Sequence, residues 1–247
     1  MDLSIIIPVY NSEKTIIELI NELEYQLNNI YTYEIIFIDD YSMDNSYEVL
    51  KNEAKLNKKI KVIKLIKNYG QQNAIYAGLN FVKGKYVITM DDDLQHCSDY
   101  IVKMIEKINE GNDLVYGVSE SNSKMSYKNL GALSRDLFFK MNFPNIDYHK
   151  VSSFRVFRSS LIEKILKNNY RFIYLSAILL EITDKVDYID VCKRKRIHGK
   201  SNYNFIKLMK LFLKLNFYYS HFISEKIKPR GNQYIIENKI NLRGVYE

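Results

Sequence analysis

The stretch KGKYVITMDDDLQH, from Lys83 to His96, decides the fold class and locates the site. Apolar and β-branched residues, typical of a buried strand, run directly into three consecutive aspartates, Asp91, Asp92 and Asp93. Like charges placed side by side at the end of a buried strand raise one another's energy unless a cation lies beside them. The stretch therefore predicts a strand that ends at a cation, and its alternative is an acidic, solvated turn.

Apolar runs of the same kind recur along the first hundred residues. They are Leu3–Tyr10, Tyr33–Asp40, Ile60–Ile66 and Lys85–Asp93. Helical patterns lie between them, at Glu13–Leu27 with Ile16, Ile17, Ile20 and Leu23 on one face, at Asp44–Leu56 and at Gln71–Val82. Continuous apolar strands that alternate with helices indicate an α/β fold, with a mostly parallel sheet flanked by helices on both faces.

Polar clusters follow three of these strands. They are Pro8–Asn11, Asp39 with Asp40, and Asp91–Asp93. Ligands of open α/β sheets bind beyond the carboxyl ends of the strands. We therefore expect the three clusters to meet at one edge of the sheet and to form the site.

The sequence excludes two common nucleotide-binding classes. No GxGxxG follows the first strand, which argues against an ordinary dinucleotide-binding dehydrogenase, and no GxxxxGK[ST] is present, which argues against a P-loop enzyme. An acidic strand end cannot hold a phosphate directly, because both are anions. It can do so through Mg²⁺ or Mn²⁺, which prefers carboxylate, phosphate and water oxygens. We expect the metal on Asp91 and Asp93, with a diphosphate bound to it.

The motifs LSIIIPVYNSEKTI, EIIFIDDYSMDNS and KNYGQQNAIYAGLNFVKGKYVITMDDDLQ occur in this order and at characteristic spacing. Together they resemble family 2 glycosyltransferases of the GT-A (Rossmann-like) fold. The later blocks SSFRVFRSSLI and RKRIHGKSNY are similar to the branch that contains dolichyl- and polyprenyl-phosphate sugar transferases. The resemblance is close from Leu3 to about Asp99 and looser beyond it. It implies a nucleotide sugar, with UDP or GDP, as the donor.

The resemblance also implies roles for individual residues. Those expected to bind the nucleotide sugar are Pro8, Tyr10, Asn11, Glu13, Asp39, Asp40, Gly70, Gln71, Asp92, Gln95, Lys200 and Ser201. Those expected to act in catalysis are Asp91, Asp93, Arg155 and Arg196. Local alternatives stay open: Pro8 ends a strand, Gly70 is a turn glycine that needs a positive φ, and Gln95 caps the next helix.

The chain departs from the family pattern at two positions. Tyr41 stands where the family often has glycine, so this turn must differ or be strained. Asn202 stands where a lysine is usual, and Lys200 lies two residues earlier. The second departure puts the strength of diphosphate binding at this loop in doubt.

The acceptor of the sugar is either a hydroxyl or a phosphate, and the two need different residues. A sugar hydroxyl needs a general base, and Glu181 and Asp184 are the candidates, neither of them convincing. A phosphate acceptor is already ionised at neutral pH and instead needs cations. Arg135, Arg155 and Arg158 are available for the acceptor phosphate, and Arg196 for the donor diphosphate, because guanidinium groups suit phosphate geometry.

The net charge of +7 is concentrated near the C-terminus. Eleven Lys or Arg residues and one acid, Glu225, lie between Lys193 and Arg230. Leu208, Leu211, Phe212 and Leu215 fall on one helical face beside a basic stripe of Lys207, Lys210 and Lys214. This pattern predicts an amphipathic helix at an anionic membrane surface. The alternative is a helix packed on the catalytic domain with solvated lysines.

We accordingly expect a GT-A domain at residues 1–202 and, at 203–247, a basic amphipathic helical extension with a C-terminal tail. Two cysteines without metal-ligand spacing or a disulfide framework favour a reducing compartment. The first residues do not form a signal peptide, and no apolar run is long enough to span a bilayer. We expect a cytoplasmic protein on the inner face of the membrane, with no nucleic-acid partner and with self-association left open.

The leading interpretation is metal-dependent, inverting transfer of a sugar from a nucleotide sugar to a polyprenyl phosphate. The first alternative is transfer to a hydroxyl of a growing glycan or lipid-linked saccharide. The alternative from a different class is a catalytically inactive, membrane-associated scaffold. An intact Asp91 and Asp93 pair argues against the scaffold.

Overall fold

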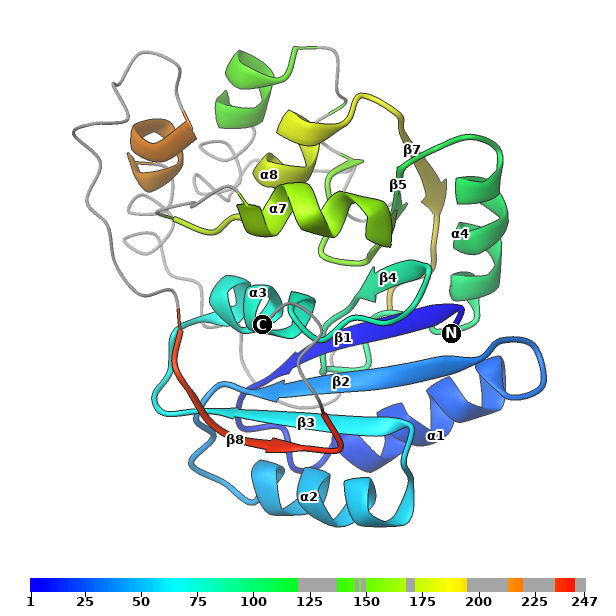
Figure 1. Cartoon of the computed structure of the whole chain (residues 1–247). Helices are drawn as coiled ribbons and strands as arrows, with labels where there is room; N and C mark the ends of the chain where they lie inside the picture. Colours follow the sequence, from blue (N-terminus) through cyan, green and yellow to red (C-terminus); the bar gives the residue numbers. More distant parts are fainter. Residues whose placement is uncertain are drawn as a thin grey trace.

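The computed structural model describes residues 1–119, 137–144, 147, 150–167, 172–194, 213–219 and 234–242. Strands and helices alternate through the first part of the chain, and the later elements pack around them (Figure 1). The first elements are β1 (Leu3–Val9), α1 (Ile16–Leu27), β2 (Tyr33–Asp39), α2 (Ser46–Leu56), β3 (Ile60–Leu65), α3 (Gln71–Leu79) and β4 (Tyr86–Thr89). They are followed by α4 (Tyr100–Asn109), β5 (Leu114–Val118), β6 (Arg155–Arg158), the 3₁₀ turn η2 (Ser159–Leu161), α7 (Ile162–Lys167), α8 (Leu175–Ile182), β7 (Val186–Asp190) and β8 (Ile236–Ile240).

The described strands form one sheet in the order β7-β5-β6-β4-β1-β2-β3-β8. β1 pairs in parallel with β2 and β4, β2 with β3, and β5 with β7. β6 is antiparallel to β4 and β5, and β8 is antiparallel to β3. The prediction of a mostly parallel sheet flanked by helices is confirmed. We call the side where β1, β2 and β4 end the carboxyl edge, and the opposite side the amino edge.

Helices cover both faces of the sheet (Figure 1). Successive side chains of a strand point to opposite faces, so Ile5 and Ile7 of β1 pack in the cluster with α1, α2 and α4, whereas Ile6 packs in the cluster with α3, α7 and α8. Each of these three isoleucines is fully buried. The two buried layers hold β1, β2 and β4 rigidly in place and so fix the position of the carboxyl edge.

The buried face of α1 differs by one residue from the expected face. Ile16, Leu19, Ile20, Leu23 and Leu27 are buried, as a period of 3.6 requires, but Ile17 is half exposed. Ile17 was therefore assigned wrongly to the buried face. Because Ile17 is adjacent to the apolar stripe and is itself apolar, the sequence alone does not show that it lies outside the buried face.

The described part of residues 203–247 lies against the catalytic sheet. In the helical segment 213–219, Leu215 and Tyr219 are buried in the cluster with α3 and α8, and Lys214 is exposed. β8 adds an edge strand beside β3. No separate C-terminal extension is evident in these described residues, which corresponds to the alternative of a helix packed on the domain. The boundary at residue 202 stays a prediction, because Leu208, Leu211, Phe212, Lys207 and Lys210 lie outside the described residues.

The described helices were also compared with the length of a bilayer span. None of them combines sufficient length with sufficient apolar character to cross a membrane.

Candidate functional site

The three polar clusters meet at the carboxyl edge, because β4, β1 and β2 are neighbours and run parallel. Asp92, after β4, accepts hydrogen bonds from the Ser12 hydroxyl at 2.6 Å and from the Tyr10 amide at 3.3 Å, both after β1. The Asp40 amide, after β2, donates to the Val9 carbonyl at 2.9 Å. The expected juxtaposition is thus present in the structure.

Asp39 ends β2 and Asp40 follows it, and both carboxylates are buried. Asp40 accepts hydrogen bonds from the amides of Tyr69 (2.7 Å) and Gly70 (2.8 Å), which join the loop before α3 to the edge. The Ser42 amide lies 3.4 Å from both carboxylate oxygens of Asp39, which is a longer contact than those of Asp40.

Gly70 and Gln71 link the start of α3 to the metal motif. Gly70 has φ +88°, a backbone conformation that glycine adopts without strain, which agrees with the alternative role of a turn glycine. The residue that follows it, Gln71, donates from Nε2 to Oδ1 of Asp91 at 2.6 Å. Gln71 therefore orients Asp91.

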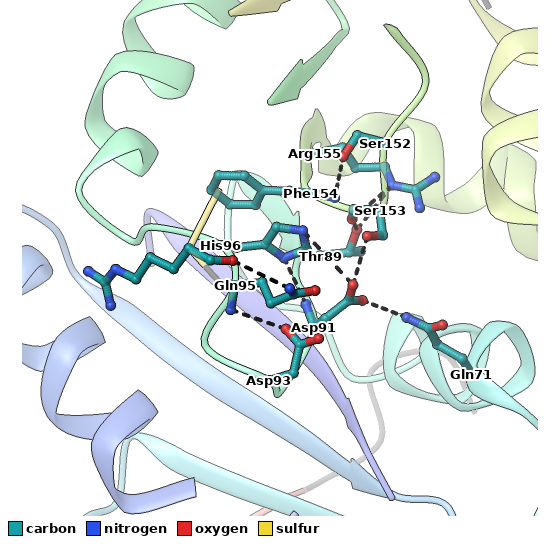
Figure 2. Close-up of polar contacts among 11 residues, drawn as sticks. Gln71, Thr89, Asp91, Asp93, Gln95, His96, Ser152, Ser153, Phe154 and Arg155 are labelled. Carbon is teal, nitrogen blue, oxygen red and sulfur yellow. Dashed lines mark hydrogen bonds and ion pairs between the residues drawn. The ribbon is translucent and has the colours of Figure 1, made fainter. Parts of the chain in front are cut away.

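Asp91 is the centre of a hydrogen-bond network (Figure 2). Its Oδ2 accepts the Ser153 hydroxyl at 2.9 Å, so both carboxylate oxygens have a neutral donor and keep a further lone pair. Its amide donates to Nδ1 of His96 at 3.2 Å. Burial lowers the pKa of His96, and a neutral ring that accepts at Nδ1 carries its proton on Nε2, which lies 3.9 Å from Asp91 Oδ2.

Asp93 and Gln95 complete the loop after β4, which we call the metal loop (residues 91–97). The Gln95 amide donates to Oδ1 of Asp93 at 3.1 Å. The intervening Leu94 is buried with φ +60°, so the loop turns sharply there. Gln95 Nε2 is directed at the Arg194 carbonyl at 3.4 Å, and α4 begins later, at Tyr100, so the alternative of Gln95 as its cap is wrong.

The metal loop fits an ion that needs few protein ligands. Within the residues that the structure describes, no group of three or more His, Cys, Asp and Glu side chains is arranged to hold a metal. Mg²⁺ and Mn²⁺ are commonly held by one or two carboxylates, with substrate phosphates and water completing the octahedron. Asp91 and Asp93 supply carboxylates one residue apart, and fixed bonds to neutral partners orient both.

The electrostatics of the edge favour a bound cation. Burial, with added repulsion from Asp91 and Asp93, raises the pKa of Asp92 to about 6. Burial also raises the pKa of Asp39 and of Asp40. Carboxyl groups whose charged form is disfavoured are stabilised as carboxylates by a cation placed among them.

The end of β1 and the residues after it hold three of the positions expected to bind the nucleotide. Pro8 lies in β1 opposite Ile38, beyond the last pairing of β1 with β4 at Ile6 and Thr89, where its missing N–H breaks no ladder bond on that side. Tyr10 is exposed. Asn11 has φ +56° and accepts the Met43 amide at its Oδ1 at 2.8 Å.

The turn after β2 departs from an unstrained conformation, as expected. Tyr41 has φ +65°, which is rare for a bulky residue, and its side chain is 42% exposed. Glu13 accepts the Asn45 amide at 3.0 Å, and its own amide donates to Asp44 at 3.2 Å. Glu13 thus contacts the loop before α2, where it supports the turn.

Arg155 starts β6 beneath the metal loop and is only 1% exposed. Its Nε donates to the Thr89 hydroxyl at 3.1 Å and its Nη1 to the Ser176 hydroxyl at 2.8 Å. The Ser153 carbonyl lies 3.4 Å from the same Nε, and Ser153 is the partner of Asp91 (Figure 2). Arg155 thus lies behind the metal loop as a buried, hydrogen-bonded cation.

Arg158 lies at the amino edge and is not available to a phosphate at the carboxyl edge. β6 is antiparallel to β4, so Arg158 pairs with Tyr86 at the start of β4, whereas Arg155 pairs with Thr89 at its end. Arg158 donates to the carbonyls of Ile108 and Asn112, both at 2.9 Å, and lies 3.5 Å from Asp113. Its assignment to the acceptor was wrong, because the direction of β6 is not encoded in the local pattern.

The two candidate general bases also lie toward the amino edge. Glu181 and Asp184 are exposed residues at the end of α8 and just after it. Between them, Thr183 donates to Asp113 at 2.9 Å, and Asp113 precedes β5 at the amino edge. α8 meets the carboxyl edge only through its first turn, where Ser176 contacts Arg155. Neither acid is placed to deprotonate a substrate near Asp91.

Sequence reasoning missed three residues that contact the aspartates of the site: Ser12, Ser153 and His96. Ser153 lies 62 residues from Asp91, and Ser12 lies 80 residues from Asp92, so no spacing rule connects them. His96 belongs to the quoted stretch, and its stacking on Phe154, with ring centroids 5.0 Å apart, was not foreseen. Arg135, Arg196, Lys200 and Ser201 lie outside the described residues.

Curated proteins with similar sequences are sugar transferases by name. The chain is 30% identical over 220 residues to an undecaprenyl-phosphate 4-deoxy-4-formamido-L-arabinose transferase of Edwardsiella ictaluri (strain 93-146), covering 86% of this chain and 66% of that protein. It is 27% identical over 211 residues to the uncharacterized glycosyltransferase YkcC of Bacillus subtilis (strain 168), covering 84% of this chain. The chain spans 66% and 65% of the lengths of these two relatives.

Solved structures show the same fold. Glucosyl-3-phosphoglycerate synthase from Mycobacterium tuberculosis, in complex with Mn²⁺, UDP-glucose and phosphoglyceric acid, is similar with a TM-score of 0.63 and 14% identity, over 87% of this chain and 77% of that chain. S. aureus TarS 1-349 is similar with a TM-score of 0.57 and 19% identity, over 92% of this chain and 68% of that chain. These likenesses agree with the expected GT-A arrangement.

The sequence profile described as Glycosyl transferase family 2 matches residues 4–166. The matched range contains β1 to β6 and all the aspartates of the carboxyl edge. Since it includes more than half of the chain, the chain belongs to glycosyl transferase family 2.

Proposed function

We propose that this protein transfers a sugar, with inversion, from a nucleotide-diphosphate sugar to a polyprenyl phosphate. The observation that carries the proposal is the metal loop at the carboxyl edge. Asp91 is oriented there by Gln71 (2.6 Å) and Ser153 (2.9 Å), close to the buried Asp39 and Asp40. A Mg²⁺ or Mn²⁺ ion on Asp91 and Asp93 would stabilise the charge on the departing nucleoside diphosphate.

The residues after β1 and β2 would bind the nucleotide. Asp39 would accept a hydrogen bond from the base edge, because the Ser42 amide reaches its carboxylate only at 3.4 Å. Tyr10 is exposed beside Asp92, whose carboxylate lies within reach of the ribose hydroxyls in this scheme. The base stays open between uracil and guanine.

The position of two acids supports a phosphate acceptor. A hydroxyl acceptor needs a general base near the metal loop, whereas Glu181 and Asp184 lie toward the amino edge. A phosphate monoester is ionised at neutral pH and attacks without one. The relative from Edwardsiella ictaluri is named for transfer to undecaprenyl phosphate, which supports the same acceptor class here.

Cations near the acceptor would complete the scheme. Arg155 places a positive charge behind Ser153 and Asp91, held by its bonds to Thr89 and Ser176. Because its side chain is only 1% exposed, it would stabilise an acceptor phosphate mainly through its charge, unless Ser153 moves aside. Arg196, Lys200 and Ser201 remain the proposed partners of the donor diphosphate.

The acceptor lipid places the reaction at a membrane surface. We include in the proposal a cytoplasmic protein bound peripherally to the inner face, with the basic stripe of Lys207, Lys210 and Lys214 directed at anionic lipid. The exposure of Lys214 opposite the buried Leu215 supports an outward-facing stripe. Replacing the three lysines with glutamate should abolish flotation with anionic liposomes, and unchanged flotation would remove this part of the proposal.

The reaction is tested by following a radiolabelled nucleotide sugar into a lipid extract, with Mn²⁺ and a polyprenyl phosphate present. We expect label in the extract that depends on the lipid phosphate and disappears on chelation of the metal. Label transferred only to a saccharide hydroxyl would favour the first alternative. If no metal-dependent nucleotide binding is detected, the inactive scaffold would be favoured.

A further inference from the structure

The only two cysteines of the chain lie directly across from each other. His96 and Lys193 form an antiparallel bridge, and the Arg194 amide donates to the Gln95 carbonyl at 3.0 Å. The register continues to Cys97 and Cys192, where the Cys97 thiol lies 3.2 Å from the Cys192 carbonyl. The two thiols, 95 residues apart in sequence, are therefore cross-strand neighbours.

The register places the two cysteines at positions whose usual spacing allows a disulfide. Directly opposed residues of antiparallel segments have Cα atoms about 4.5–5.5 Å apart, and disulfides span about 4.4–6.8 Å. Their side chains lie on the same side of the ladder. In the reduced structure the thiols have separate partners, since the Tyr100 hydroxyl lies 3.3 Å from Cys192 Sγ. A rotation of the Cys192 side chain would bring the two sulfurs together.

The two thiols differ in access in the way that disulfide exchange requires. Cys192 is exposed, whereas Cys97 is 5% exposed. Reaction with a soluble disulfide begins at a thiol that the reagent can reach, and a buried neighbour can then resolve the mixed disulfide. The pair thus combines an exposed attacking thiol with a buried resolving thiol. Burial raises the pKa of the Cys97 thiol, so the resolving step should be the slower of the two.

We propose that Cys97 and Cys192 form a reversible disulfide when the protein meets a small-molecule disulfide such as oxidised glutathione. The Cys192 thiolate attacks one glutathione sulfur and expels the other as a thiol. The Cys97 thiolate then attacks the Cys192 sulfur and expels the second glutathione. The two protein thiols lose two protons and two electrons, and the oxidised reagent becomes two thiols.

The bond would fix the metal loop to the segment that follows β7. The segment 192–194 already contacts the loop through Gln95, and the Arg194 side chain is ion-paired to Glu22 of α1. A disulfide would convert this set of weak contacts into a covalent link four residues after Asp93. The proposal does not depend on the identity of the sugar donor or acceptor.

The test treats the full-length protein with oxidised glutathione and follows its intact mass and peptide map. We expect the wild type to lose two hydrogen atoms, to yield one linked pair of peptides containing Cys97 and Cys192, and to be restored by dithiothreitol. Amide hydrogen exchange at Arg194 should be slower in the oxidised form, because its bond to Gln95 is then clamped.

Two variants separate this disulfide from simple modification of an exposed thiol. Cys97→Ser should retain a stable glutathione adduct on Cys192, and Cys192→Ser should acquire none, since the remaining thiol is buried. Cys97→Ala repeats the first variant if serine is not tolerated in the core. A wild type that accumulates the same stable adduct as Cys97→Ser, or that forms only disulfide-linked dimers, would overturn the proposal. Unchanged exchange at Arg194 in the oxidised form would overturn the clamping of the loop.

Discussion

The carboxylates at the two edges of the sheet have different kinds of partner. At the amino edge Asp113 lies 3.5 Å from Arg158, and Asp187 lies 3.1 Å from Lys107. At the carboxyl edge Asp40 is bonded to the amides of Tyr69 and Gly70, and Asp92 to the Ser12 hydroxyl and the Tyr10 amide. The amino edge thus pairs acids with basic side chains, whereas these carboxyl-edge acids are held by neutral donors.

This difference explains why the same residue type serves structure at one edge and binding at the other. An acid paired with Arg or Lys has its charge compensated within the protein and gains little from a further cation. At the carboxyl edge neutral donors orient Asp92, and burial, with repulsion from Asp91 and Asp93, raises its pKa to about 6. We therefore propose that this edge accepts a cation from outside the chain.

The largest expected effect comes from removing one carboxylate at each edge. Asp91→Asn should lower turnover by at least about 10²-fold, because a metal contributes several kcal/mol to a charged transition state. The matched variant Asp113→Asn should cost about 1 kcal/mol of stability, through weakened contacts to Arg158 and Thr183, and leave turnover nearly unchanged. The measurements are the lipid-extract assay and thermal unfolding. Equal losses of turnover in both variants would remove the distinction between the edges.

A smaller effect is expected from the two arginines of β6, which reach opposite edges. Arg155→Ala removes the buried charge behind the metal loop, with its bonds to Thr89 and Ser176, and should raise the apparent KM for polyprenyl phosphate about tenfold. Arg158→Ala removes bonds to Ile108 and Asn112 and should lower the free energy of unfolding by about 1–3 kcal/mol with KM unchanged. An altered KM in Arg158→Ala with wild-type KM in Arg155→Ala would contradict the assignment of the two arginines to opposite edges.

The pH dependence of stability tests the burial of charge at the carboxyl edge. Burial raises the pKa of Asp39 above its ordinary 3.8, with Asp44 adding to the effect and Ser42 and Lys64 opposing it. A raised folded-state pKa favours folding below the unfolded pKa, and this contribution is lost as the pH rises through the folded value. The melting temperature of Asp39→Asn, relative to that of the wild type, should therefore increase as the pH rises from about 4 to neutral. A difference that stays constant with pH would show that Asp39 carries no cost of buried charge.

The smallest effects should come from the acids toward the amino edge. Glu181→Gln and Asp184→Asn should each change turnover by less than a few-fold, because neither residue is near the metal loop. Removal of a general base typically costs on the order of 10²–10⁴-fold. A collapse of turnover in either variant would move the acceptor from a phosphate to a hydroxyl.

The first half of the fold could be predicted from local pattern alone. β1, β2 and β4 are buried on both faces and carry largely apolar runs, and the acids that follow β2 and β4 are visible in the sequence. β3 keeps four buried apolar residues, with the partly buried Lys61 and Lys64 between them. β5 to β8 were not predicted. For β7 and β8 the reason is that these edge strands are only partly buried and their residues, VDYID and IENKI, mix apolar and charged types. An edge strand lacks the burial that makes a strand recognisable.

The residues of the site were also predictable only in part. Asp39, Asp40 and the Asp91–Asp93 cluster follow from the rule that ligands bind beyond the carboxyl ends of parallel strands. Ser153 and Arg155 depend on β6 running antiparallel beside β4, and Arg155 and Arg158 look alike until that direction is known. The cross-strand position of Cys97 and Cys192 is equally invisible, because it arises from a single isolated bridge.

The central claim is that carboxylates of the carboxyl edge hold a metal-bound nucleotide diphosphate. Calorimetric titration with UDP and with GDP, with and without Mn²⁺, tests it most directly on the wild type and Asp93→Asn. We expect one nucleotide to bind the wild type only when Mn²⁺ is present, and we expect this binding to be lost in Asp93→Asn, whose melting temperature should be unchanged or higher. Equal nucleotide affinity in the wild type and Asp93→Asn, or affinity independent of Mn²⁺, would contradict the claim.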